Sequence, residues 1–98
     1  MDTNKDRLSY ALDSAMDNLE FVLDAASIDF EVTTSPNTNQ YIVSFAEGEQ
    51  FAYVTAELSW DGEPAIFVDI YRVDDDGGEH WVCGDMSIDA ATLYIADA

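Results

Sequence analysis

The first part of the chain carries apolar residues at the three-to-four-residue spacing of an amphipathic helix. Between Thr3 and Ala26 these positions are Leu8, Leu12, Ala15, Met16, Leu19, Val22, Leu23 and Ala26. The spacing predicts a single helix of about six turns. Thr3 followed by Asp6 is an approximate capping box and places the start of the helix. Ser27 and Ile28 give no strong stop signal, so the other end is less sharply defined.

After residue 27 the hydrophobic period changes to two, which is typical of strands. The alternating runs predict strands at Ile28–Thr33, Tyr41–Ala46, Phe51–Trp60, Ala65–Val73 and Glu79–Met86. Turn-forming clusters separate them at 35–39, 47–49, 61–63 and 74–78. Ser87 can cap a short helix over Ile88–Ala96, although Leu93-Tyr94-Ile95 also fits a strand. The order predicts one α+β domain over residues 1–98, a long helix packed on a four- to five-stranded antiparallel meander.

The register of the third and fourth strands follows from the loop that joins them. A three-residue loop at Asp61-Gly62-Glu63 pairs Leu58 with Ile66 and Ala56 with Val68. A two-residue loop would place Ala56 opposite Phe67 and mix the two faces of the sheet. The three-residue loop is therefore expected, with Ala52, Val54, Ala56, Leu58 and Trp60 on the face that packs against the helix.

The balance of charge excludes several classes of ligand. The 98 residues include 21 Asp and Glu against three Lys and Arg, for a formal charge of −18. Apolar residues at 48% and aromatic residues at 12% are too many for a disordered acidic tail. The basic residues Lys5, Arg7 and Arg72 cannot neutralise a run of phosphates, so we expect no direct binding of nucleic acid, anionic membranes or phosphorylated substrates.

The N-terminal sequence and the single cysteine favour a reducing compartment. The N-terminus has no apolar stretch behind a basic region, and the longest mostly apolar run, Pro64–Ile70, is far too short to span a membrane. The one cysteine, Cys83, cannot form an internal disulfide, and no Cys/His spacing indicates zinc. We therefore expect a cytoplasmic protein.

Part of the acidity is concentrated along the predicted helix. A helical projection places five acids within an arc of about 60°: these are Asp6, Asp13, Asp17, Glu20 and Asp24, which we call the acidic row. We expect the row to face away from the apolar stripe. The last four acids have no Lys or Arg three or four residues away, so each close pair costs about 0.2–0.5 kcal/mol. An ordinary solvated helix face mixes both signs of charge, and the row is therefore a candidate binding surface.

The predicted sheet carries a second acidic surface on the face turned away from the helix. By strand alternation this face holds Phe51, Tyr53, Glu57, Phe67, Asp69 and Tyr71, and the same parity adds Trp81 and Asp85. The loop Asp74-Asp75-Asp76 and the nearby Glu79 add further charge at one end. Aromatic anchors among acids are typical of an interface, so Glu57, Asp69, Tyr71, Asp74, Asp75, Asp76 and Glu79 join the acidic row as expected partner-binding residues. A second copy of the chain, in a homodimer, is an alternative cover for this face.

No motif for catalysis, metal or cofactor binding is found. Asp74–Glu79 is rich in carboxylates, but counted from Asp74 the sixth and twelfth positions are Glu79 and Asp85, where an EF-hand needs Gly and Glu. The single His80 is interpreted as structural and Cys83 as an inert thiol. Because no carboxylate pair stands out, we expect neither an enzyme nor a cofactor.

In size and charge the chain resembles the small acidic phage proteins that mimic DNA, which inhibit restriction enzymes, CRISPR effectors or uracil-DNA glycosylase. The resemblance is carried by the acidic row and the Asp74–Glu79 loop. The order of helix and meander is also similar to that of the uracil-DNA glycosylase inhibitor, which binds through a sheet edge and an apolar pocket. Glu31 and Ser27-Ile28 do not reproduce the spacing of its binding motif.

The resemblance implies an inhibitor that binds the basic groove of a DNA- or RNA-binding protein, in the cytoplasm of a host cell if the chain is phage-encoded. Two alternatives stay open. One is an acidic adaptor or chaperone that masks a basic protein segment. The other is a small domain whose acidity is an adaptation to high salt, although six Ile and ten Phe and Tyr are more bulky residues than we expect in a salt-adapted core.

Overall fold

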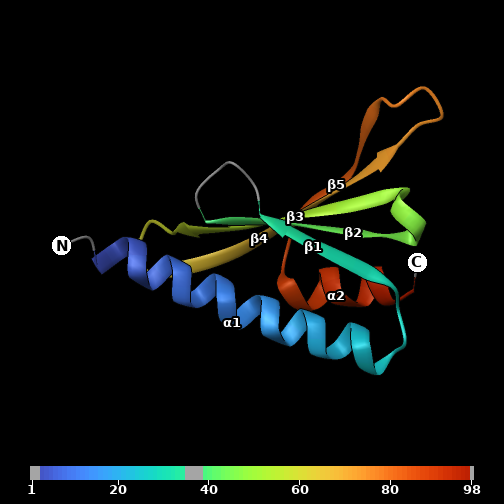
Figure 1. Ribbon diagram of the computed structural model, residues 1–98. Helices are drawn as coiled ribbons and strands as arrows, with labels where there is room; N and C mark the ends of the chain where they lie inside the picture. Colours follow the sequence, from blue (N-terminus) through green and yellow to red (C-terminus); the bar gives the residue numbers. More distant parts are fainter. Residues whose placement is uncertain (1–2, 35–38, 98) are drawn as a thin grey trace.

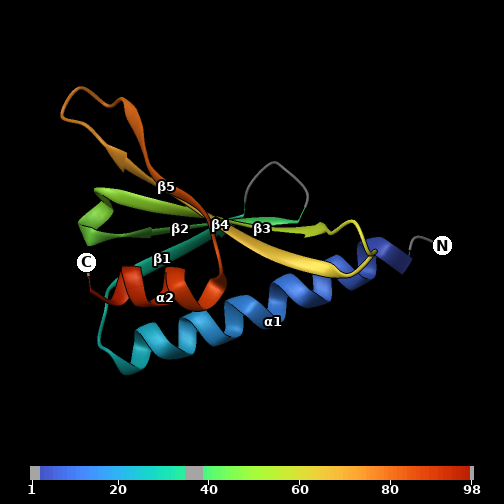
Figure 2. The ribbon, with the colours of Figure 1, turned by 180° about the vertical axis from the view of Figure 1, so that it is seen from behind.

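The computed structural model describes residues 3–34 and 39–97, with side chains from residue 6 onward. The order is α1 (Thr3–Ala25), β1 (Phe30–Thr34), β2 (Gln40–Phe45), η1 (Ala46–Gly48), β3 (Gln50–Leu58), β4 (Pro64–Val73), β5 (Glu79–Met86) and α2 (Ile88–Ala96). The strands form one antiparallel sheet in chain order, and both helices lie side by side on one of its faces (Figures 1 and 2). The predicted α+β fold, a helix on a β-meander, is confirmed.

The core lies between the helices and one face of the sheet, which we call the covered face. Register partners such as Ala52 and Ile70, or Val54 and Val68, point to this side and are fully buried. Their neighbours along each strand point to the opposite side, the open face, which neither helix covers. The buried apolar residues are Leu12, Met16, Leu19, Leu23, Val43, Phe45, Ala52, Val54, Ala56, Val68, Ile70, Ala91 and Ile95.

The end of α1 is a Schellman motif. The N–H of Ile28 donates to the carbonyl of Leu23 at 3.0 Å, and the N–H of Ser27 donates to the carbonyl of Asp24 at 3.1 Å. Ser27 has φ of 60°, the left-handed conformation that this motif requires and that glycine usually supplies. Ile28 then packs against the core. The helix boundary is therefore well defined, although the sequence carries no glycine to signal it.

Two of the sequence predictions, for the start of α1 and for the first turn, can be compared with the structure only in part. α1 begins at Thr3, as expected, but the Thr3 side chain of the expected capping box lies outside the described residues. Residues 35–38 of the turn cluster expected at 35–39 also lie outside them. The second strand ends one residue earlier than predicted, because Ala46, Glu47 and Gly48 all have positive φ and cannot continue an extended strand.

The expected register of β3 and β4 is wrong by two residues. Leu58 pairs with Pro64 and Ala56 with Ile66, in place of the predicted Leu58–Ile66 and Ala56–Val68. The loop does have three residues, but they are 60–62, because the N–H of Ser59 donates to the carbonyl of Glu63 at 2.8 Å. Gly62, at φ of 81°, supplies the left-handed last position of such a loop.

Trp60 is therefore part of this turn, with 97% of its surface exposed, and not on the covered face as predicted. A shift of two residues preserves the parity of the pairing, so the paired side chains of β3 and β4 stay on their predicted faces.

The β4–β5 turn repeats the design of the β3–β4 turn. The N–H of Asp74 donates to the carbonyl of Gly78 at 2.8 Å, and Gly77 has φ of 85°. In both turns an Asp carboxylate before the glycine accepts the N–H two residues ahead, Asp61 from Glu63 and Asp76 from Gly78, each at 3.1 Å. The Asp-Gly pair thus explains two of the clustered acids as turn formers.

β5 contains two register shifts relative to β4. Val68 pairs with Met86, Ile70 with Cys83 and Tyr71 with Trp81, so β5 has one extra residue in each interval. Bulges of this kind bend a strand and increase its twist. The β4–β5 hairpin accordingly rises away from the helices, on the side of the open face (Figures 1 and 2).

The C-terminal segment is a helix and not a strand. Ser87 is its N-cap, and the Ser87 hydroxyl accepts the N–H of Ala90 at 3.2 Å, as the sequence predicts. Ala91 and Ile95 enter the core beside α1.

Candidate protein-binding surfaces

The acidic row lies on the flank of α1 beside the edge of the sheet, and not directly opposite the core. Four of its five acids are exposed. Asp13 accepts a hydrogen bond from the hydroxyl of Tyr41 on β2 at 3.2 Å, and Glu20 is half-buried. On a helical projection the centre of the row is about 100° from the centre of the buried residues, so a flank position is the natural result. Asp13, Asp17 and Glu20 line a hollow of about 330 Å³ with Val32 and Tyr41.

Three acids of the row affect the pKa of the nearby Tyr41. The hydrogen bond and the negative charge of Asp13 raise the pKa of the Tyr41 phenol above 10.0, with smaller contributions from burial, Glu20 and Asp17. A phenol that must ionise beside three carboxylates holds its proton more tightly. Tyr41 was not among the expected site residues. The available signal was its place on the covered face at the beginning of the second strand.

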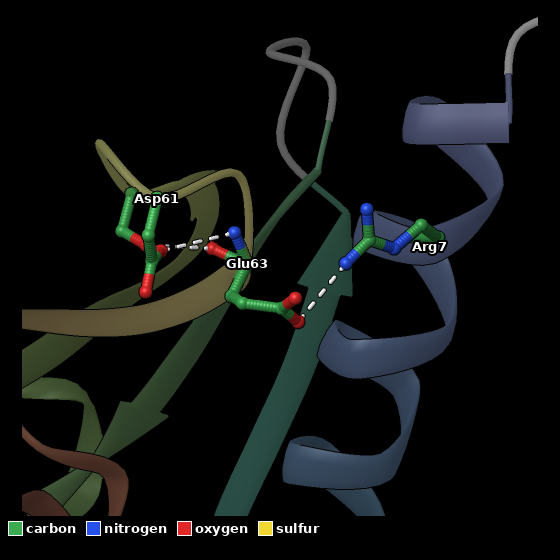
Figure 3. A network of polar contacts seen from close by, with 4 residues as sticks. Arg7, Asp61 and Glu63 are labelled. Carbon is green, nitrogen blue, oxygen red and sulfur yellow. Dashed lines mark hydrogen bonds and ion pairs between the residues drawn. The ribbon is translucent and has the colours of Figure 1, made fainter.

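Cations do not compensate the central part of the row. Among the described side chains, those of residues 6–34 and 39–97, Asp13, Asp17, Glu20 and Asp24 form no ion pair. Arg7 instead binds Glu63 in the β3–β4 turn at 3.0 Å, and the backbone N–H of Glu63 binds Asp61 (Figure 3). The Ser59 hydroxyl and the Glu63 N–H both stabilise the carboxylate of Asp61 and lower its pKa.

The outward side of α1 carries two exposed aromatic residues that the sequence prediction did not single out. Tyr10 is 77% exposed and Phe21 is 73% exposed. Both belong to the helical face opposite the core, next to the acidic row. Large exposed aromatic side chains beside uncompensated carboxylates have the composition of a protein interface.

On the open face, the structure brings together the predicted Glu57, Asp69 and Tyr71. Tyr71 pairs with Phe51, and Asp69 pairs with Tyr53, so all four side chains share this face. Asp69 also has a structural role, because its Oδ1 accepts the N–H of Asp85 at 3.2 Å in the bulged part of β5. Asp85 has φ of 54° at this bulge, so the simple parity that placed its side chain on the open face does not apply there.

The acids of the β4–β5 turn are largely occupied within the hairpin. Arg72 lies 3.9 Å from Asp74, and His80 forms an ion pair with the same carboxylate when it is protonated. Asp76 closes the turn, and Asp75 is exposed. Glu79 lies at the start of β5, where its charge helps to raise the pKa of Tyr53 on the open face.

The expected residues therefore form separate groups. The acidic row lies in the helix layer, whereas Glu57, Asp69, Tyr71 and Glu79 lie on the open face of the sheet, and Asp74–Asp76 form the hairpin turn. Within the described part of the chain, no group of three or more His, Cys, Asp or Glu is arranged to hold a metal ion, and no helix is long and apolar enough to cross a membrane.

Comparisons with family models, with curated proteins and with solved structures find no match to this chain.

Proposed function

We propose that the protein is a nucleic-acid mimic, an inhibitor whose acidic row occupies the basic groove of a DNA- or RNA-binding protein. The observation that supports this proposal is the run of four carboxylates at Asp13, Asp17, Glu20 and Asp24, for which no ion pair is found among the described side chains. The hydrogen bond to Asp13 raises the pKa of Tyr41, and the charges of Asp13, Glu20 and Asp17 raise it further, so the negative potential of these acids is not cancelled at Tyr41.

The spacing of these charges is comparable with that of a nucleic-acid strand. From residue 13 to residue 24 the helix rises about 16 Å, which gives one charge in roughly every 5 Å. A single DNA strand carries one charge in about 3.4 Å. A helix holds its carboxylates in a fixed row, so a partner that neutralises phosphates with Lys and Arg meets a preorganised anion array.

The positions of the two described arginines support the same proposal. Arg7 is paired with Glu63 and Arg72 lies next to Asp74, each at a hairpin turn. Neither arginine is close enough to an acid of the row to form an ion pair. An arrangement evolved for solubility alone would gain a few tenths of a kcal/mol from each cation placed along the row.

A competition experiment on a DNA resin tests the proposal. Nucleic-acid-binding proteins from the cells in which the protein occurs are retained on the resin, and purified protein is then added at constant salt. We expect it to release a specific protein, identified by mass spectrometry. The test variant is Asp17→Lys with Asp24→Lys. Both side chains are exposed, and neither forms a hydrogen bond with another described residue, so the fold should tolerate the change.

The matched control is Glu47→Lys with Glu49→Lys, which changes the net charge equally in the exposed β2–β3 turn. The proposal predicts that the control still releases the partner and the row variant does not. Equal release by all three proteins would indicate a general polyanion effect and contradict the proposal. A partner that binds this protein and DNA at the same time would favour an acidic adaptor instead.

A further inference from the structure

We propose that the open face of the sheet is a second binding surface, which takes an arginine-bearing segment of a protein partner against Phe51, Tyr53, Tyr71 and Trp81. This inference does not depend on what the acidic row binds. It rests on the arrangement of the rings, on the charge of the residues around them and on the absence of a covering helix among the described residues.

Three of the rings form one contiguous cluster. Phe51 and Tyr71, partners in the β3–β4 register, are stacked with centroids 5.6 Å apart and an interplanar angle of 13°. Tyr53 is edge-on to both, at 5.3 Å from Phe51 and 5.4 Å from Tyr71. The three residues are half-buried. Neither helix covers the open face on which they lie (Figure 1). The cluster is therefore a contiguous aromatic platform on the open face.

Trp81 extends this platform onto β5. It pairs with Tyr71 across the β4–β5 ladder and is 64% exposed. Gly84 makes room for the indole, because a Cβ at that position would lie only 2.9 Å from the Trp81 Nε1. The bulges of β5 lift this hairpin on the side of the open face (Figure 1). The pairing with Tyr71 places Trp81 beside the platform.

The charges around the platform are negative. Glu57, Asp69 and Glu79 share the open face with the rings. Burial of the Tyr53 phenol raises its pKa, and the charge of Glu79 raises it further. None of the described residues on the open face is basic, because Arg72 alternates to the other side between Tyr71 and Val73.

Arginine is the side chain that fits this combination. Its guanidinium stacks on aromatic faces, is more weakly hydrated than an ammonium and forms two parallel hydrogen bonds with a carboxylate. A second copy of the chain fits poorly, because two molecules of charge −18 would bring Glu57, Asp69 and Glu79 of each copy together. Nucleic acid is repelled for the same reason.

The test uses a capped synthetic peptide in which arginine and serine alternate, and its lysine counterpart of equal charge. A Trp60→Phe background removes the indole of the distant turn, so that fluorescence reports Trp81 alone. We expect the arginine peptide to change the Trp81 emission and to bind more tightly than the lysine peptide. Replacement of two rings, Phe51→Leu with Tyr71→Leu, should weaken binding by about tenfold.

The matched control is Asp17→Asn with Asp24→Asn on the acidic row, which leaves the open face intact. Circular dichroism and the unfolding transition of each variant establish that it is folded. If the double ring variant is not folded, the single variant Tyr71→Leu replaces it in the test. Loss of binding in the ring variant together with retention in the row variant supports the inference. Equal weakening in both variants, or equal affinity for the two peptides, overturns it. Self-association that buries Trp81 without peptide would also overturn it, in favour of a second copy.

Discussion

The two faces of this sheet are made from the same strands but from different kinds of side chain. The covered face has small and branched aliphatic residues, such as Ala52, Val54 and Ile70, which are fully buried under the helices. The open face has aromatic rings and carboxylates, which are only partly buried. Apolar burial stabilises in proportion to the area removed from water. The covered face therefore supplies most of the stability, and the open face is free to serve recognition.

The largest expected effect is on the covered face. Leu19→Ala leaves a cavity between α1 and the sheet at a fully buried position, and we expect a loss of about 3 kcal/mol in the free energy of unfolding. Tyr71→Leu on the open face should cost only about 1 kcal/mol or less, the worth of a cross-strand aromatic contact. Chemical denaturation of both variants measures the difference. Similar losses in the free energy of unfolding would show that the open face stabilises the fold as much as the covered face does, and would contradict the proposed division of roles.

A smaller effect is expected at Gly84, where an added side chain would collide with Asp69 and Trp81. A Cβ there would overlap the Oδ1 of Asp69 and displace it from the N–H of Asp85. We expect Gly84→Ala to destabilise the fold by about 1–2 kcal/mol. In an Asp69→Ala background the same substitution should cost less, because the clashing carboxylate is gone. A double-mutant cycle measures this coupling, and strict additivity would contradict it.

The smallest effect concerns two tyrosines, one on each face. The hydrogen bond to Asp13, followed by the charge of Asp13, is the main cause of the raised pKa of Tyr41, whereas burial is the main cause of the raised pKa of Tyr53. Asp13→Asn should therefore lower the pKa of Tyr41 toward 10.0 and leave Tyr53 unchanged. Added salt should likewise act more strongly on Tyr41, since screening weakens charge effects but not burial. Ultraviolet absorbance of the phenolates during a pH titration follows both groups.

The sign of the accompanying stability change follows from linkage. A folded pKa above the unfolded value favours the protonated phenol in the folded state. Its contribution is fully present below about pH 10 and is lost as the pH rises through the folded pKa of Tyr41. Asp13→Asn reduces the difference between the folded and unfolded pKa of Tyr41. The free energy of unfolding of the variant should therefore fall less than that of the wild type as the pH rises through this range. A steeper loss in the variant would contradict the assignment.

The sequence predicts the elements and faces of this fold because hydrophobic period depends on the residues themselves. It does not predict the Ser27 stop, because the left-handed conformation there is imposed by the docking of Ile28 and not by a glycine. The β3–β4 register was missed because the sequence gives two placements for a three-residue loop, and only the φ of Gly62 selects one. The bulges of β5 likewise involve a contact between strands, the hydrogen bond that Asp69 on β4 accepts from the N–H of Asp85 on β5.

The candidate surfaces were predictable to a similar extent. Composition and projection identified the acidic row, but its place beside Tyr41 depends on the angle at which α1 crosses the sheet. Alternation correctly grouped Tyr71 with Asp69 and Glu57. It could not show that Asp74 and Asp76 are held within their own hairpin, since this depends on where Arg72, His80 and Gly78 come to lie.

The bulges of β5 also affect how molecules of this protein meet one another. β5 is an outer strand, so its free N–H and carbonyl groups could template a strand from another molecule. Regular addition of that kind needs an unbroken ladder of evenly spaced groups. The two extra residues between Trp81 and Met86 break that ladder, and Asp69 already accepts the N–H of Asp85. The bent hairpin therefore also protects a concentrated solution of the protein against aggregation through this edge of the sheet.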